Sequence, residues 1–140
     1  MPLWQIHHGS QTLSDEDKKA LAKQITEVYV NYGLPAFYVR VEYQEMSPTT
    51  SFTGGEHNPK FVGLTVYHLA RQMTSDSQVQ RFLSDVDTVL TPLFEPKGID
   101  WEYFVTEAPS NLWKINGLVP PPAGSEGEKQ WRRLNRPVKL

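Results

Sequence analysis

The order strand, helix, strand occurs twice in this chain, and this repetition limits the folds open to it. The first copy runs from Leu3 to Met46 and the second from Phe61 to Glu107. Right-handed crossovers place the helices of two successive βαβ units on the same face of one sheet. The pattern therefore predicts an α+β fold with a four-stranded mixed sheet and two helices on one face. No further helix is left for the second face, so another subunit is expected to cover it.

The individual elements are expected from apolar periodicity and from turn formers. Ser14, with Asp17 three residues later, is an N-cap signal for the first helix, and Ser75 with Gln78 resembles a second capping box. Pro92 should end the second helix or kink its last turn. The expected strands are residues 3–8, 37–43, 61–69 and 101–105, and the first helix is expected at residues 14–32.

Composition narrows the class of protein. The chain has 140 residues, of which 39% are hydrophobic and 11% aromatic, so we expect residues 1–140 to form a single domain with one sizeable core. A formal net charge of -2 gives no field that would recruit nucleic acid or an anionic membrane. The absence of cysteine excludes disulfides and thiolate metal sites. There is no apolar run of membrane-spanning length and no signal-peptide pattern, which predicts a cytoplasmic location.

The composition of the chain changes after Pro109. Residues 118–124 are rich in proline, so residues 118–140 are expected to form an extended carboxyl-terminal arm. The last stretch gathers basic residues around Trp131 and Leu134, and a basic aromatic tail can bind nucleic acid. The interpretation we favour is a solvated arm packed on a neighbouring subunit, because the chain as a whole is acidic.

Residue 2 is a proline at the start of the first expected strand. Removal of Met1, which is usual ahead of a small residue, would leave Pro2 with a free secondary amine. An α-amino group has a pKa of about 8. Modest desolvation would make it a neutral base near pH 7, whereas polar surroundings would keep it a cationic acid. The alternative is a structural role, because proline at a strand's first position loses no ladder hydrogen bond.

Further features extend this motif along the chain. They are the sequence Pro2-x-x-Gln5-Ile6-His7, the helix that follows it, the strand at residues 39–46 and the loop Phe52-Thr53-Gly54-Gly55. Together they resemble the tautomerase superfamily, whose members use an amino-terminal proline. In length, and from residue 2 to about residue 122, the chain is similar to the long group typified by cis-3-chloroacrylic acid dehalogenase and its fungal relatives. The resemblance implies a homotrimer and a keto-enol tautomerase, an isomerase that acts on a small carboxylate substrate. No cofactor is expected.

The resemblance also assigns roles to single residues. Pro2 matches the catalytic proline, Arg71 the arginine that holds the substrate carboxylate, and Tyr103 a tyrosine that assists near the reacting centre. A planar guanidinium suits the task of Arg71 because it can bind both carboxylate oxygens. Arg40 resembles the strand arginine of 4-oxalocrotonate tautomerase, which polarises a substrate oxygen. The alternative for Arg40 is a solvent-facing residue paired with Glu42.

Three positions depart from the dehalogenase pattern. Tyr29 stands in place of a histidine, and Thr74 in place of a second arginine. Ile115, with Lys114 beside it, stands in place of a glutamate that helps to activate water. Tyr29, Lys114 and Ile115 are still expected to bind substrate, as is Phe52. Proton transfer on a small 2-keto or enol acid survives these losses, whereas dehalogenation and hydration should be weak or absent.

Other interpretations were weighed against this one. A trimeric scaffold or binding protein could keep the fold after losing the dehalogenase machinery, because fold alone does not guarantee function. The four histidines do not predict a metal site, since the adjacent His7 and His8 should point to opposite faces of a strand. Gly54 and Gly55 are expected in a turn or subunit contact, because no helix begins after them to complete a phosphate site.

Overall fold

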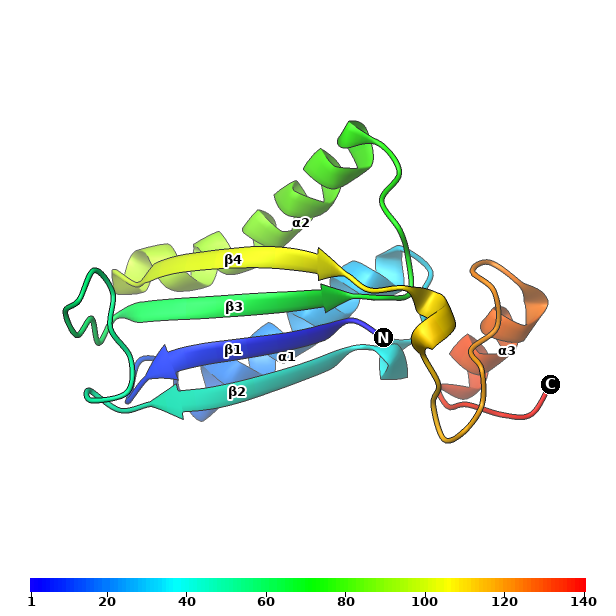
Figure 1. Ribbon diagram of the computed structural model, residues 1–140, viewed down its shortest axis with the longest axis horizontal. Helices are drawn as coiled ribbons and strands as arrows, with labels where there is room; N and C mark the ends of the chain where they lie inside the picture. Colours follow the sequence, from blue (N-terminus) through cyan, green and yellow to red (C-terminus); the bar gives the residue numbers. More distant parts are fainter.

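The computed structural model describes residues 1–140 and is built on one four-stranded sheet (Figure 1). Its strands are β1 (Leu3–Gly9), β2 (Arg40–Met46), β3 (Phe61–His68) and β4 (Asp100–Glu107), in the spatial order β2-β1-β3-β4. The pairs β1–β2 and β3–β4 are parallel, and the two inner strands β1 and β3 are antiparallel. The predicted mixed sheet of two βαβ units is confirmed.

Two long helices, α1 (Asp15–Asn31) and α2 (Asp76–Phe94), cover the same face of the sheet (Figure 1). Helix α1 begins with the expected capping box, in which Ser14 accepts from the Asp17 amide and Asp17 accepts from the Ser14 amide. The prediction of two helices on one face is therefore confirmed.

The start and end of α2 differ from the prediction. Ser75 accepts from the amide of Gln78, but the Gln78 side chain accepts from Thr74 instead of completing a capping box. Pro92 lies inside the helix, which continues to Phe94. Proline removes one hydrogen bond to the preceding turn. At this exposed position water can satisfy the carbonyl left free, so the last turn persists.

The second strand begins later than its alternating pattern indicates. Residues Ala36–Tyr38 form a short 3-10 turn, η1, in place of strand. Tyr38 is buried there, and its ring lies 4.9 Å from that of Trp113 and 6.4 Å from that of Trp131. Tertiary packing of aromatic rings from the carboxyl-terminal region thus overrides the local β pattern.

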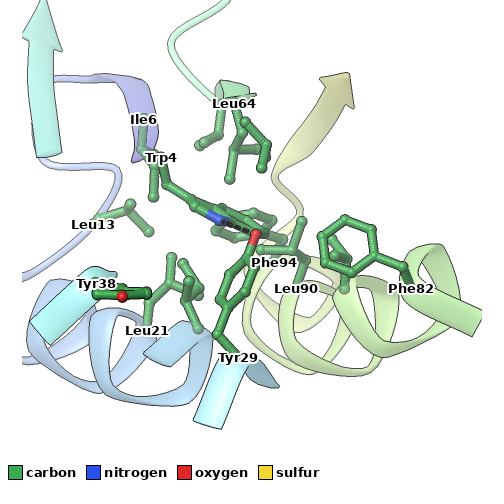
Figure 2. Packing of buried hydrophobic residues seen from close by; sticks show 14 of the residues in the cluster. Trp4, Ile6, Leu13, Leu21, Tyr29, Tyr38, Leu64, Phe82, Leu90 and Phe94 are labelled. Atoms are coloured by element: carbon green, nitrogen blue, oxygen red, sulfur yellow. Dashed lines mark hydrogen bonds between the residues drawn. The ribbon is translucent and has the colours of Figure 1, made fainter. Parts of the chain in front are cut away.

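The core lies between the sheet and the two helices. Alternate residues of the inner strands point into it, among them Trp4 and Ile6 of β1 and Val62, Leu64 and Val66 of β3. Figure 2 shows the indole of Trp4 at the centre of this cluster. The helices contribute Leu21, Ile25, Tyr29, Phe82, Val86, Leu90 and Phe94.

The opposite face of the sheet carries no helix (Figure 1). We expected apolar side chains there, and the face proves to be mixed. Leu3 and Phe61 are half-buried and Phe104 is 58% exposed, while Gln5 and Thr65 on the same face are polar. Within one chain this face is left partly open to solvent.

The carboxyl-terminal region corrects the prediction of an extended arm. Residues 118–125 contain no helix or strand, but Glu126–Leu134 forms helix α3, capped by Ser125. Helix α3 lies beyond one end of the sheet (Figure 1). Its Trp131 is buried in the same chain, 6.1 Å from the ring of Phe37, because this indole finds its apolar partners in η1. The segment is thus not a solvated arm.

Candidate active site

Pro2 lies at the amino-terminal start of β1, the second strand of the sheet. It is buried, and its carbonyl accepts a hydrogen bond from the amide of Arg40 at 2.9 Å. This bond joins β1 to the start of β2 and fixes the backbone next to the chain terminus. Because β1 and β3 are antiparallel, the start of β1 lies beside the end of β3, which His68 terminates.

The amino terminus itself lies in a poorly solvated place. In the chain with Met1 present, burial lowers the pKa of the terminal amino group to about 4. Desolvation acts in this direction because it disfavours the charged form of an amine. Burial at the start of the chain therefore disfavours the charged form of the terminal amine.

A cavity of about 300 Å³ opens at this end of the molecule, between the end of β3 and the two helices. Tyr29 and Tyr32 of α1 line one side, and Arg81 and Phe82 of α2 line another. The remaining lining residues are Leu34, His68, Arg71, Gln72, Met73 and Gln78. A larger groove between α1 and α2 lies away from the sheet and contains neither His68 nor Arg71. The smaller cavity is therefore the candidate site.

His68 is the buried polar residue of this cavity. Only 4% of it is exposed, and neither ring nitrogen has a hydrogen-bond partner. Its ring lies 5.9 Å from that of Tyr29 and 5.2 Å from that of Phe82. Burial lowers the pKa of His68, and the amino-terminal charge and Arg71 act in the same direction, against Glu107. The imidazole is therefore neutral, with one nitrogen free to donate and the other to accept.

Sequence reasoning considered His68 only as a possible metal ligand and missed it as a site residue. Its position directly before the Leu69-Ala70-Arg71 segment was the available signal. The structure contains no group of three or more histidine, aspartate or glutamate side chains placed to hold a metal ion.

Arg71 follows the end of β3 and lines the cavity, but it already holds a carboxylate. Its Nη2 donates to Oε1 of Glu128 at 2.8 Å, and its Nη1 donates to Oε2 at 3.1 Å. Nη1 also donates to the carbonyl of Ala70 at 2.9 Å. The Glu128 side chain is 4% exposed and the Arg71 side chain 25% exposed, so the pair is largely shielded from water.

Tyr38 lies close to this ion pair. Its buried hydroxyl has no hydrogen-bond partner. Burial first, and then the charge of Glu128, raise the pKa of Tyr38 to about 12. The phenol therefore keeps its proton at neutral pH.

Tyr29 also lines the cavity. It is buried, and its hydroxyl accepts from Nε1 of Trp4 at 2.9 Å (Figure 2). Burial raises the pKa of Tyr29 well above its usual range, so the residue offers a neutral hydroxyl and no base. This bond links helix α1 to strand β1 two residues from Pro2.

Two predicted catalytic residues are not brought to the cavity within one chain. The hydroxyl of Tyr103 donates to Asp87 at 2.8 Å and to the carbonyl of Leu83 at 3.3 Å, which ties β4 to α2. Arg40 is paired with Glu42 on the open face of the sheet, as its alternative interpretation stated. Its backbone, but not its guanidinium, contacts Pro2.

The other predicted contacts lie apart from the cavity lining. Ile115 is half-buried in a tight turn in which its amide and carbonyl bond to Leu118, and Lys114 beside it is exposed. Phe52 is 60% exposed in the loop between β2 and β3, at the opposite end of the sheet from Pro2. Thr74 is exposed and bonds to Gln78.

No helix of this structure has the length and apolar character needed to cross a bilayer.

Known structures with the same architecture were found. A structure from the thermophilic fungus Aspergillus fumigatus, described as a probable enzyme, shares 64% identity, covers 100% of this chain and 98% of its own, and superposes with a TM-score of 0.97. Native RhCC from Rhodococcus jostii RHA1 shares 37% identity over 99% of both chains, with a TM-score of 0.95.

A more distant structure, N1 of the cis-3-chloroacrylic acid dehalogenase family, shares 17% identity over 95% of this chain and 97% of its own. Its TM-score of 0.75 shows a common fold. No curated protein matches the chain. The family model described as "Putative oxalocrotonate tautomerase enzyme" matches residues 1–136. The chain therefore belongs to this tautomerase family, as its amino-terminal proline motif indicated.

Proposed function

We propose that this protein is a keto-enol tautomerase that acts on a small 2-keto or enol carboxylic acid, with Pro2 as the proton carrier after removal of Met1. One observation carries the proposal. The buried start of β1 lies beside a cavity that contains two arginines and a neutral, unpartnered histidine. Membership of the tautomerase family supports the same chemistry.

The mechanism needs one base and one anchor for the acid. The neutral amine of Pro2 removes a proton from the carbon beside the substrate carbonyl. The electron pair left on carbon forms a C=C bond, and the carbonyl electrons move to oxygen. Protonation of that oxygen completes the enol, and the same steps in reverse return the keto form. Arg71 and Arg81 hold the carboxylate during the transfer.

Dehalogenation and hydration should be weak or absent. Both need a base that activates water in addition to a proton carrier. Ile115 cannot supply one, and the hydroxyl of Tyr29 is already bonded to Trp4. Halide release from cis-3-haloacrylates should therefore be at most a trace beside tautomerisation, as measured by halide assay and proton NMR.

The proposal includes a homotrimer. The open sheet face carries half-buried and exposed apolar side chains that a second copy would cover. Association would also allow residues distant from Pro2 within one chain, such as Phe52 and Tyr103, to approach the site of another.

A non-catalytic scaffold is the second candidate, and one contact favours it. The carboxylate-binding arginine is already paired with Glu128 inside the chain. Such a protein would keep the fold and bind acids weakly or not at all.

The amino terminus decides between the two candidates. Mass spectrometry of the purified protein should show that Met1 is absent, and the protein should ketonise phenylenolpyruvate. Pro2→Ala should lower kcat by at least about 10²-fold, the size expected for a positioned proton carrier. The matched control is Pro48→Ala, which changes an exposed loop proline and should leave kcat unchanged. A retained Met1 together with absent turnover would support the scaffold. Undiminished turnover by Pro2→Ala would show instead that Pro2 is only the structural start of the strand.

A further inference from the structure

Few charged side chains line the cavity beside the amino terminus. Among its lining residues only Arg71 and Arg81 carry a full charge, because His68 is neutral. Arg81 lies with its guanidinium 5.7 Å from the ring centre of Tyr32 and forms no ion pair. Two positive charges therefore face the cavity.

Glu128 does not line the cavity but lies against the other side of Arg71. Its Oε1 accepts from the amide of Gly124 at 2.9 Å as well as from Arg71. It compensates one of the two arginine charges. Glu128 therefore lowers by one unit the positive charge that the arginines present to a ligand.

The hydrogen-bond donors of Arg71 also leave room for only one ligand carboxylate. A guanidinium has five N–H groups in one plane. Both Nη1 hydrogens and one Nη2 hydrogen are used by Glu128 and the carbonyl of Ala70. The Nε–H and the second Nη2–H have no partner, and these two run parallel along one edge of the guanidinium. One further carboxylate can bind that edge while Glu128 stays in place.

Glu128 is held firmly enough to stay. Helix α3 is anchored by the buried Trp131, whose Nε1 donates to the carbonyl of Val138 at 2.8 Å. Beyond the helix, Oδ1 of Asn135 accepts from the amide of Phe37 at 2.9 Å. Displacing Glu128 would require these contacts to break, so its carboxylate stays fixed behind Arg71.

We propose that Glu128, supplied by the carboxyl-terminal helix, is a specificity-determining residue that sets the cavity to accept acids with one carboxylate in preference to acids with two. Glu128 does so by accepting from both Nη1 and Nη2 of Arg71 and by cancelling one positive charge. The inference rests on the proposed function for the identity of the cavity as a substrate site. Its role in selecting acids is independent of whether turnover occurs.

The test compares two inert five-carbon acids, pentanoate and glutarate, which differ by one carboxylate. Dissociation constants are measured by NMR titration of the Arg71 Nε–H signal in the full chain, and inhibition constants are measured in the tautomerase assay. The variant is Glu128→Gln. The matched control is Glu126→Gln, on the same helix, where the side chain is 82% exposed and pairs with Lys129.

The charge of Glu128 acts on a ligand charge across about 10 Å. At an effective dielectric constant near 20, its removal changes the affinity by roughly tenfold for each unit charge that the ligand carries. Glu128→Gln should therefore tighten glutarate more than pentanoate, and the ratio of their dissociation constants should shift by roughly tenfold towards glutarate. Glu126→Gln should leave the ratio unchanged.

An unchanged ratio, an equal shift in Glu126→Gln, or weaker binding of both acids by Glu128→Gln would overturn the inference. The last result would show that Glu128 only holds Arg71 in place. Glu128→Asp keeps the negative charge, so it should keep the wild-type ratio of dissociation constants even if folding is weakened. A shift of this ratio in Glu128→Asp as large as that in Glu128→Gln would also overturn the inference. A wild-type chain that binds pentanoate but turns over no enol would refute the proposed function and leave this inference intact.

Discussion

The indole of Trp4 donates to the hydroxyl of Tyr29 at 2.9 Å, and the two rings meet edge to face with their centres 6.5 Å apart. Both residues are 1% exposed. One contact therefore joins the strand that carries Pro2 to the helix that forms a wall of the cavity.

Tyr29→Phe should destabilise the protein by about 1–3 kcal/mol, because it leaves the buried N–H of Trp4 without an acceptor. The free energy of unfolding in urea measures this cost. Tyr67→Phe is the matched control, since that half-buried tyrosine lies on the open sheet face. A cost below the error of the urea measurement would mean that water reaches the indole.

His68 should make stability depend on pH. Its folded pKa is lowered by burial, with the amino terminus and Arg71 adding to the shift and Glu107 opposing it. In the unfolded chain the pKa of His68 is about 6.5, so the unfolded chain binds a proton at a higher pH than the folded chain does. Stability should fall as pH falls through this window, and His68→Phe should flatten that dependence in urea unfolding from about pH 7.5 to 5. His57 is exposed, so His57→Gln should keep the wild-type slope of unfolding free energy against pH. An equal slope in His68→Phe and wild type would contradict the prediction.

Phe104 should contribute to assembly through the open sheet face. Phe104→Lys places a charge on a side chain that is 58% exposed, so it should weaken a trimer while leaving the fold intact. Light scattering after gel filtration measures the mass, and circular dichroism checks the fold. Gln80→Lys, on the exposed side of α2, is the control and should remain trimeric. A variant that assembles as well as the wild type would exclude this face.

Trp131→Ala should cost about 3–5 kcal/mol, the range for removing a large buried aromatic side chain. The loss includes contacts with Phe37 and Tyr38 and the hydrogen bond to Val138. Leu134→Ala, at an exposed position of the same helix, should cost less than about 1 kcal/mol. Equal effects in urea unfolding would show that α3 contributes little to the folded state.

The sequence predicted the parts of the fold that depend on local signals. The Ser14 cap and the repeated strand-helix-strand order specified α1 and the sheet. The 3-10 turn at Ala36–Tyr38 was missed because its cause is distant in sequence, namely the rings of Trp113 and Trp131. Helix α3 was missed because proline and basic composition suggested an extended arm, although Ser125 is a cap signal.

The candidate site was predicted in part. Pro2 and Arg71 lie at one end of the sheet because β1 and β3 are antiparallel, and helix α1 brings Tyr29 to the cavity at the same end. Glu128 could not be predicted, since its contact with Arg71 depends on how the last helix folds back. The pairing of Arg40 with Glu42 was one of the two interpretations of the sequence, whereas the bond of Tyr103 to Asp87 joins a strand to a helix and is not revealed by a pattern of residue types.

The central position of β1 has a consequence for the order in which the protein assembles during synthesis. β1 is synthesised before the other three strands of the sheet, yet its Leu3 pairs with Arg40 of β2 and with Tyr67 of β3. A strand with both neighbours distant in sequence must wait for them, and closing such long loops slows folding. The amino-terminal segment therefore stays unpaired until β3 has been synthesised. The removal of Met1 that the proposed function requires would have to take place before this pairing encloses Pro2.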